Sequence, residues 1–249
     1  MQPDLFAVTN MARQVEWFSS VDSTMTIAAR LAREGCPSGT VVGADEQTAG
    51  IGRHGHSWHS EPGAGLYVSV VLRLDLASGA LPLVMLALGL ATQQAIAEVT
   101  GLAPDLRWPN DVLLDEKKCA GILAQFEGDA VIAGIGINVS HTRFPPDLAT
   151  LATSLRVAGA PAVSREQLLA ALLRSIDEAC RVLVTDGPDA IRDAFAHASS
   201  YASGRRVRVE QNGDFLTGVT AGLDPSGFLM LRQDNGSVTK ILAGGVRPA

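Results

Sequence analysis

A glycine-spaced loop that carries cationic side chains is the segment best suited to binding an anion. Gly50, Gly52 and Gly55 punctuate the loop 50–58, which also carries Arg53 and follows the apolar run 40–44. Glycines let backbone amides approach an anion closely, and an arginine adds charge and hydrogen-bond donors. The sequence therefore predicts a flexible lid that closes over a phosphate or a similar group.

The same three glycines satisfy the dinucleotide-binding pattern G-x-G-x-x-G. That pattern requires a helix to begin directly after the glycines, so that its first amides face a pyrophosphate. The continuation 56–63, His-Ser-Trp-His-Ser-Glu-Pro-Gly, has no apolar helical period and ends in turn residues. The sequence context therefore excludes a Rossmann-type site at these glycines.

A transition-metal site is a second hypothesis for the lid, because it carries His54 and His56 with His59 directly after it. Imidazole is a common metal ligand, but no cysteine accompanies these histidines and no pattern of supporting residues surrounds them. These histidines are therefore more simply interpreted as substitutions in an anion-binding lid than as metal ligands.

Strands and helices alternate around this loop. Short apolar or β-branched runs predict strands at 15–18, 66–72, 120–126 and 131–137, and a core helix follows at about 82–99. Asp22 or Ser23 is expected to cap a helix that ends near Gly35. Ser164 begins a capping box for a helix reaching about Val184, and another short helix follows. This order predicts an α/β or α+β class.

The character of the chain changes near Gly204. Residues 206–209 alternate between charged and apolar, and the turn pairs Asn212-Gly213, Ser226-Gly227 and Asn235-Gly236 recur at hairpin spacing. Four or five short strands in this length predict a small β-barrel. We expect one domain over residues 1–202 and a second over 203–249.

Composition narrows the class of protein. The 249 residues are 47% hydrophobic and 18% charged with a net charge of −6, which is ordinary for a globular protein and unsuited to nonspecific nucleic-acid binding. Three widely spaced cysteines without C-x-x-C favour reduced, mostly buried thiols in the cytoplasm. No secretory signal is recognisable, and the apolar stretch 81–91 is too short for a membrane span, so we expect neither export nor membrane association.

Five motifs together resemble the biotin protein ligase family in order and spacing. The resemblance begins near residue 15, extends to the C-terminus, and is most specific in the pairing of Trp-Pro-Asn-Asp with Lys-x-Ala-Gly-Ile-Leu. It implies an α+β catalytic domain with a mixed sheet and flanking helices, followed by an SH3-like barrel. The motifs are Asp22-Ser23-Thr24, Glu46–Arg53, Trp108–Asp111, Lys118–Leu123 and Gly134–Asn138.

The resemblance also implies an activity and a site. ATP and biotin would form biotinyl-5′-AMP, with release of pyrophosphate, and a carrier-domain lysine would then attack the mixed anhydride. Lys118 and Arg53 are the implied catalytic residues, and Asp111 is the implied ligand of Mg²⁺. The implied biotin contacts are Ser23, Thr24, Gln47, Gly50, Gly52, Arg53, Lys118, Gly121, Gly134 and Gly136. The implied ATP contacts are Arg53, Trp58, Asn110, Asp111, Lys118 and Asn138.

The lid departs from the family pattern Gly-Arg-Gly-Arg-x-Gly-Arg. Ile51 replaces the first arginine and His56 replaces the last. Loss of permanent charge predicts faster escape of the adenylate, and the imidazoles predict a lid that responds to pH.

The resemblance names partners and leaves alternatives open. The implied partner is the biotin carboxyl carrier domain of acetyl-CoA carboxylase or a related carboxylase, and a homodimer is expected from pairing of sheet edges. A lipoate or octanoate ligase or transferase of the related fold is the main rival. A DNA-binding repressor is disfavoured because the segment before Val15 is too short for a winged helix, and a homologue that only binds biotin is the third alternative.

Overall fold

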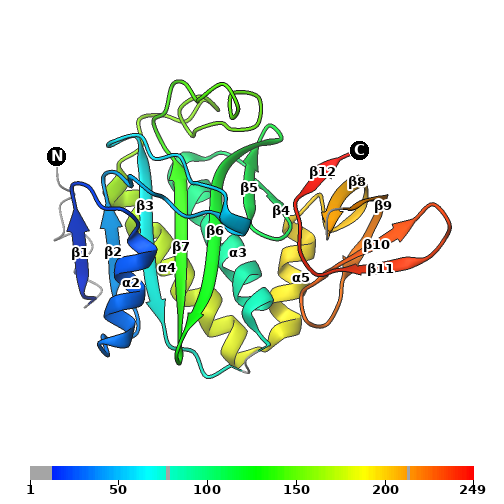
Figure 1. Ribbon diagram of the computed structural model, residues 1–249, viewed down its shortest axis with the longest axis horizontal. Helices are drawn as coiled ribbons and strands as arrows, with labels where there is room; N and C mark the ends of the chain where they lie inside the picture. Colours follow the sequence, from blue (N-terminus) through cyan, green and yellow to red (C-terminus); the bar gives the residue numbers. More distant parts are fainter. Residues whose placement is uncertain (1–12, 77–78, 212–213) are drawn as a thin grey trace.

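The computed structural model describes residues 13–76, 79–211 and 214–249, which form two β-sheets and four α-helices. The larger sheet has the strand order β1-β2-β3-β7-β6-β5-β4, in which β1 and β2 are parallel and all other neighbours are antiparallel (Figure 1). This confirms the predicted mixed sheet. Its strands are β1 (Val15–Phe18), β2 (Val41–Ala44), β3 (Gly65–Leu72), β4 (Asp105–Arg107), β5 (Asp111–Leu114), β6 (Lys117–Glu127) and β7 (Ala130–Asn138).

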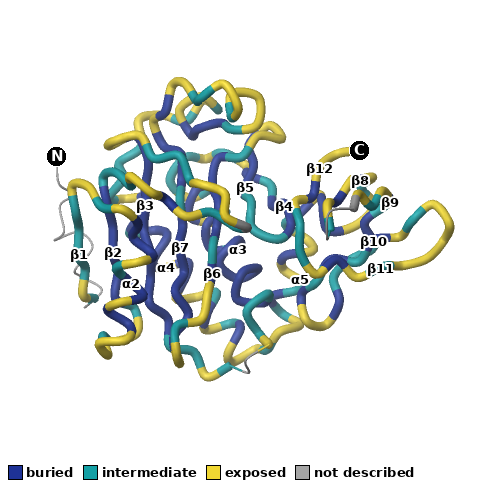
Figure 2. The backbone as a smooth tube through the Cα atoms, viewed as in Figure 1, coloured by how far each residue is buried: buried dark blue, intermediate teal, exposed yellow. Residues whose placement is uncertain are grey.

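Helices cover both faces of this sheet. Helix α2 (Thr24–Arg33) and the lid lie on one face, while α3 (Leu81–Thr100), α4 (Arg165–Thr185) and α5 (Pro188–Ala198) lie on the other (Figure 1). Residues of β3 are buried on both faces, as expected for a strand in the middle of such layers (Figure 2).

Strand alternation decides which side chains face the lid. Val68 and Val70 of β3 join the larger core beneath α3 and α4, whereas Val71 joins the smaller core under α2. The same two-residue period sends Ile135 of β7 into the larger core and Ile132 into the smaller one. The hydrophobic core on the lid face is therefore the smaller of the two.

The core helix α3 is longer than its apolar run suggests. Its 20 residues make it long and apolar enough to cross a membrane by length and composition alone, but 61% of that window is buried inside the protein. Burial of this kind is what the core helix of a soluble domain also shows, and α3 packs against α4. The prediction of a core helix at about 82–99 is confirmed to within one residue at each end, whereas the expectation that this region is too short to span a membrane is wrong on length alone.

The two predicted helix caps have different outcomes. The Ser164 side chain accepts a hydrogen bond from the Gln167 amide at 3.2 Å, as expected at the start of α4. Ser23 occupies the N-cap position of α2, but its side chain makes no capping bond. The predicted N-cap position is therefore confirmed without a bond from the Ser23 hydroxyl, and the Asp22 carboxylate instead accepts from the Ser23 amide at 2.7 Å.

The C-terminal sheet has the order β11-β10-β9-β8-β12. No hydrogen-bonded ladder joins β11 to β12 in the described chain, so the predicted barrel is an open, curved sheet. Positive φ angles at Gly227 and Gly236 confirm two predicted turns, and Asn212-Gly213 lies outside the described residues. The strands are β8 (Ser203–Gln211), β9 (Asp214–Leu223), β10 (Leu229–Gln233), β11 (Val238–Ile241) and β12 (Val246–Pro248).

One buried hydrogen bond connects this sheet to the larger domain. Trp108, which is 3% exposed, donates from Nε1 to the Gly227 carbonyl at 3.0 Å. The loop that carries Trp-Pro-Asn-Asp is thus held in place partly by the C-terminal domain, which links that domain to the predicted site.

Candidate active site

Two glycines on neighbouring strands form the floor of a small cavity on the lid face. Gly121 of β6 and Gly136 of β7 are directly opposite in the antiparallel register. The Trp58 indole lies on both, since a Cβ at Gly121 would be 2.7 Å from its Cζ3 and one at Gly136 would be 2.4 Å from its Cε2. Any larger residue at either position would displace Trp58 from the floor.

Neutral polar groups form one end of the cavity. The Thr24 amide and hydroxyl donate to Gln47 Oε1 at 2.9 and 3.1 Å, and the same hydroxyl is 2.8 Å from Ser69 Oγ on β3. Ser23 Oγ is buried beside them without a hydrogen-bond partner in the described structure. An unsatisfied buried hydroxyl is costly, and a polar ligand would satisfy it.

Cations gather at the other end. Asp111 pairs with Lys118 Nζ at 2.6 Å and Arg107 Nη2 at 2.7 Å, while Arg247 lies 3.8 Å away. Burial opposes ionisation of this carboxyl, but Lys118 and Arg107 outweigh burial and lower its pKa to about 2. One carboxylate among three cations leaves net positive charge, which favours an anionic ligand.

Neighbouring backbone holds Lys118 in position. Its amide donates to the Leu151 carbonyl at 2.9 Å, and its carbonyl accepts from the Thr153 amide at the same distance. Asn138 Nδ2 in turn donates to the Thr153 carbonyl at 3.0 Å. Lys118 is therefore fixed on both sides, by β5 and by the segment 151–153.

The lid folds into a short closed loop over the floor. The Trp58 amide donates to the Gly50 carbonyl at 2.8 Å, and the Gly52 amide donates to the His56 carbonyl at 2.7 Å. A single 3-10 turn, η1 (Arg53–Gly55), occupies the tip. These bonds make the predicted lid a compact hairpin rather than an extended loop.

Arg53 connects the lid to the cationic end. Its Nη1 donates to Asn110 Oδ1 at 3.1 Å, and Asn110 itself donates to the Ile122 carbonyl. Burial lowers the pKa of the Arg53 guanidinium, an effect that Asp111 partly opposes. Lys118 Nζ also lies 5.3 Å from the Trp58 ring centroid, so lid and strand residues meet at this end.

Most of the predicted site residues line one cavity. Ser23, Gly50, Asp111 and Asn138 do not line it, although each contacts or adjoins a residue that does. Sequence reasoning missed Met25, Val68 and Ile135, which line it through strand and helix positions. The predicted residues in the lining are Thr24, Gln47, Gly52, Arg53, Trp58, Asn110, Lys118, Gly121, Gly134 and Gly136.

Sequence reasoning also missed the partners of Asp111. Arg107 faces Asp111 in the β4–β5 register, which the short hairpin spacing could have indicated. Arg247 comes from the far end of the chain, and no local pattern indicates its approach.

The cations around Asp111 bear on the predicted magnesium site, because Mg²⁺ requires free carboxylate oxygens. The Asp111 carboxylate, already paired with cations, does not fit as a magnesium ligand.

Two family models match the chain. The Biotin/lipoate A/B protein ligase family matches residues 17–140, and the Biotin protein ligase C terminal domain matches residues 202–246. The two matches fall on the larger domain and on the open C-terminal sheet.

Similar proteins and structures agree with these matches. The bifunctional ligase/repressor BirA of Bacillus subtilis is 34% identical over 95% of this chain and 74% of its own length. The biotin--[acetyl-CoA-carboxylase] ligase of Mycobacterium tuberculosis is 34% identical over 94% of this chain and 88% of its own length. A structure of the biotin protein ligase from Aquifex aeolicus with biotin and ATP superposes with a TM-score of 0.83 at 31% identity, covering 95% of this chain and 99% of that one.

Proposed function

The chain belongs to the biotin protein ligase family, and we propose that its cavity activates biotin with ATP and transfers it to a carrier lysine. In the first step a biotin carboxylate oxygen bonds to the α-phosphorus, and the bond to the β-phosphate breaks to release pyrophosphate. In the second step the carrier amine attacks the acyl carbon, AMP leaves, and an amide forms. Both steps require stabilisation of negative charge on phosphate oxygens.

The opposed ends of the cavity are the observation that carries this proposal. Thr24 and Gln47 present neutral polar groups near β3, and Lys118 presents a cation on β6, two strands away. Adjacent strands lie about 4.8 Å apart, so the ends are separated by about 10 Å. Biotin has a neutral ureido head and a carboxylate tail, and this arrangement matches both groups.

Ligand entry requires Trp58 to move. The cavity has a volume of about 50 Å³ with the indole on the glycine floor, whereas ligand pockets are ordinarily roughly 300–1,000 Å³. We therefore assign Trp58 two positions, one on Gly121 and Gly136, and one beside the adenine after the lid has opened. Asn138 Nδ2 donates to the Thr153 carbonyl at 3.0 Å, and we assign its Oδ1 to accept from the adenine edge.

Arg53 and Lys118 would act on opposite sides of the reacting groups. Lys118 is fixed on the sheet and would neutralise the carboxylate and the α-phosphate as they approach each other. Arg53, bound to Asn110 in the closed lid, would hold the phosphate and keep water from the anhydride. Mg²⁺ enters this proposal only as a companion of ATP, with no ligand assigned on the protein.

Further parts of the proposal concern partners and location. The expected acceptor is the biotin carrier domain of acetyl-CoA carboxylase or a related carboxylase, and the net charge of −6 disfavours nucleic acid. Strands β1 and β4 end the larger sheet, and we expect a homodimer through one such edge, which light scattering would test. Free Cys36, Cys119 and Cys180 support a cytoplasmic location.

The deciding experiment measures ATP-dependent pyrophosphate release with biotin, lipoate or octanoate supplied separately. We expect release with biotin alone, followed by label transfer to a carrier domain and none to its Lys→Arg variant. Release with lipoate or octanoate instead would overturn the substrate assignment and favour the related ligases. No release with any acid would overturn the proposed activation step.

A further inference from the structure

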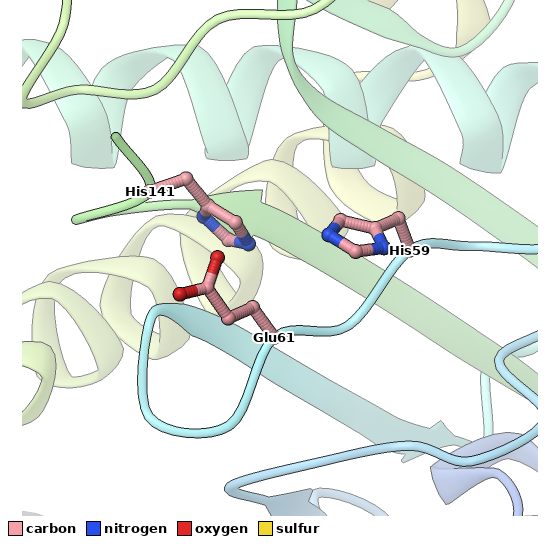
Figure 3. A group of neighbouring side chains, drawn as sticks. All are labelled: His59, Glu61 and His141. Carbon is pink, nitrogen blue, oxygen red and sulfur yellow. The ribbon is translucent and has the colours of Figure 1, made fainter. Parts of the chain in front are cut away.

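A cluster of potential metal ligands lies outside the ATP and biotin cavity, at the far end of the lid. His59 and Glu61 belong to the segment between Trp58 and β3, and His141 follows β7 (Figure 3). Gly65 pairs with Asn138 where β3 begins and β7 ends, and the Val139 and Ser140 amides both donate to the Ala64 carbonyl. The sheet register thus brings together residues that are about 80 positions apart in the chain.

The three side chains point toward one another (Figure 3). One ligand atom from each lies within 4.8 Å of the other two. Ligand atoms around tetrahedral zinc are about 3.3 Å apart, given metal–ligand lengths near 2.0–2.1 Å. Glu61 is exposed and His59 is half-buried, so rotation of these two side chains can close the difference against a fixed His141.

The His141 side chain is held in a fixed position before any metal ion binds. Its ring is fully buried and stacks on Phe144 at a centroid distance of 5.3 Å. This packing fixes the position of the imidazole.

Tyr67 supports the arrangement from the side. Its hydroxyl donates to the Glu61 carbonyl at 3.1 Å and lies 3.2 Å from His141 Nε2. His141 Nδ1 is buried without a hydrogen-bond partner among the described residues. One ring nitrogen therefore remains unsatisfied whichever tautomer is present, which is unusual for a buried imidazole whose role is packing alone.

The charge balance also favours a cation. In the described structure Glu61 makes no salt bridge, in contrast to Asp111, which pairs with Lys118 and Arg107. Two imidazoles and one carboxylate without a salt bridge form a donor set used for zinc and similar borderline-soft cations, with a fourth position open to water on the exposed side.

We propose that His59, Glu61 and His141 bind one divalent transition-metal ion of the zinc class. Bound metal would tie the residue next to Trp58 to the end of β7, and so would restrain the C-terminal end of the lid. The histidines at 54 and 56 are not required. His56 is exposed and not part of the cluster, and the His54 side chain lies outside the described structure.

Calorimetric titration of untagged, chelator-treated full-length protein with Zn²⁺ tests this proposal. We expect one ion per chain, with at least a hundredfold weaker binding in His59→Ala and at least tenfold weaker binding in Glu61→Gln. The exposed controls His56→Ala and His197→Ala should bind as the parent does. Equal binding by His59→Ala and the parent, or no binding below millimolar Zn²⁺, would overturn the site.

Thermal unfolding gives a second readout that is independent of activity. Zn²⁺ should raise the melting temperature of the parent and of His56→Ala, because a ligand bound only by the folded state stabilises it. It should not raise the melting temperature of His59→Ala. An equal rise in all three proteins would place the ion elsewhere and contradict the proposal.

Discussion

Lys118 and Arg53 face the same cavity, yet the chain holds these two cations in different ways. Lys118 lies on β6 with its backbone bonded to segment 151–153 and its ammonium group 2.6 Å from Asp111. Arg53 lies at the tip of a loop and is held by one side-chain bond to Asn110. The fixed cation is suited to stabilising a reacting centre, because it needs no reorganisation there. The loop-borne cation is suited to controlling access.

The same contrast distinguishes the cavity residues that belong to the sheet from those that belong to the lid. Lys118 and its partners belong to the sheet, and Trp58 belongs to the lid that rests on it. Loss of a sheet residue should therefore affect the chemical step or folding. Loss of a lid residue should affect binding and release. Four substitutions test this division, starting with the one whose expected effect is largest.

Replacing Lys118 should cause the largest loss of activity. Lys118→Ala removes the fixed cation that we propose faces the α-phosphate, and comparable losses of one charge-stabilising group reduce kcat by about 10²–10³-fold. Single-turnover pyrophosphate release at saturating biotin and ATP measures this effect. Lys117→Ala is the matched control, because that neighbouring lysine is exposed. A parental rate in Lys118→Ala would contradict the assigned role.

Replacing Asp111 should affect stability through its pKa. The pKa of this carboxyl is about 2 in the folded protein, against 3.8 as its ordinary value. A lowered folded pKa contributes stability above about pH 4, and that stability is lost as the pH falls toward 2. Asp111→Asn should therefore unfold about 2 kcal/mol more easily at pH 7, with the difference shrinking below pH 4.

Denaturant titrations at pH 7 and at several values below pH 4 measure this difference. Asp115→Asn is the control, since Asp115 is an exposed turn residue at φ 49° and asparagine tolerates that conformation. If Asp111→Asn matched the parent at pH 7, the buried ion pairs would contribute no net stability.

The sequence predicted the framework because local patterns determine it. The predicted strand 15–18 is β1, and the predicted helix after Ser164 is α4 with its cap. Periodicity and capping act over a few residues, so they can be recognised without the fold. The glycines at 121, 134 and 136 were also recognisable, and strand alternation places them on the lid face.

The rest of the site depends on contacts that no local pattern contains. Arg247 reaches Asp111 from the last strand, and His141 meets His59 only because β7 pairs with β3. Ser23 occupies the N-cap position that its residue type predicts, but its buried hydroxyl makes no capping bond. Residue type therefore indicates which side chains are candidates for a site, and tertiary packing determines which of them meet.

Replacing Trp58 should change binding rather than chemistry. Trp58→Ala clears the glycine floor, so biotin no longer displaces an indole and should bind about tenfold more tightly without ATP, a difference of about 1.4 kcal/mol. The KM for ATP should rise, because the variant lacks the ring expected beside adenine. Calorimetry with biotin alone and steady-state kinetics with ATP measure the two effects.

Trp58→Phe is the matched variant and should lie between the parent and Trp58→Ala. Weaker binding of biotin by Trp58→Ala in the absence of ATP would mean that the indole forms a wall of the biotin site. In that case Trp58 would belong with the fixed residues, and the division between sheet and lid would fail at this position.

Ile51 gives the smallest expected effect and the sharpest test of the lid's role. Ile51 is 45% exposed and lines the cavity, so Ile51→Arg adds a partly solvated cation near the proposed position of the phosphate. Such a charge contributes about 0.5–1 kcal/mol, which predicts a two- to fivefold longer half-life of enzyme-bound adenylate. Because exposed charges are screened, the gain should shrink as salt is raised. Rapid-quench measurement of adenylate release, with Ile51→Leu as control, distinguishes this from a change in packing. Unchanged retention in Ile51→Arg would mean that fixed residues such as Lys118, and not the lid, retain the adenylate.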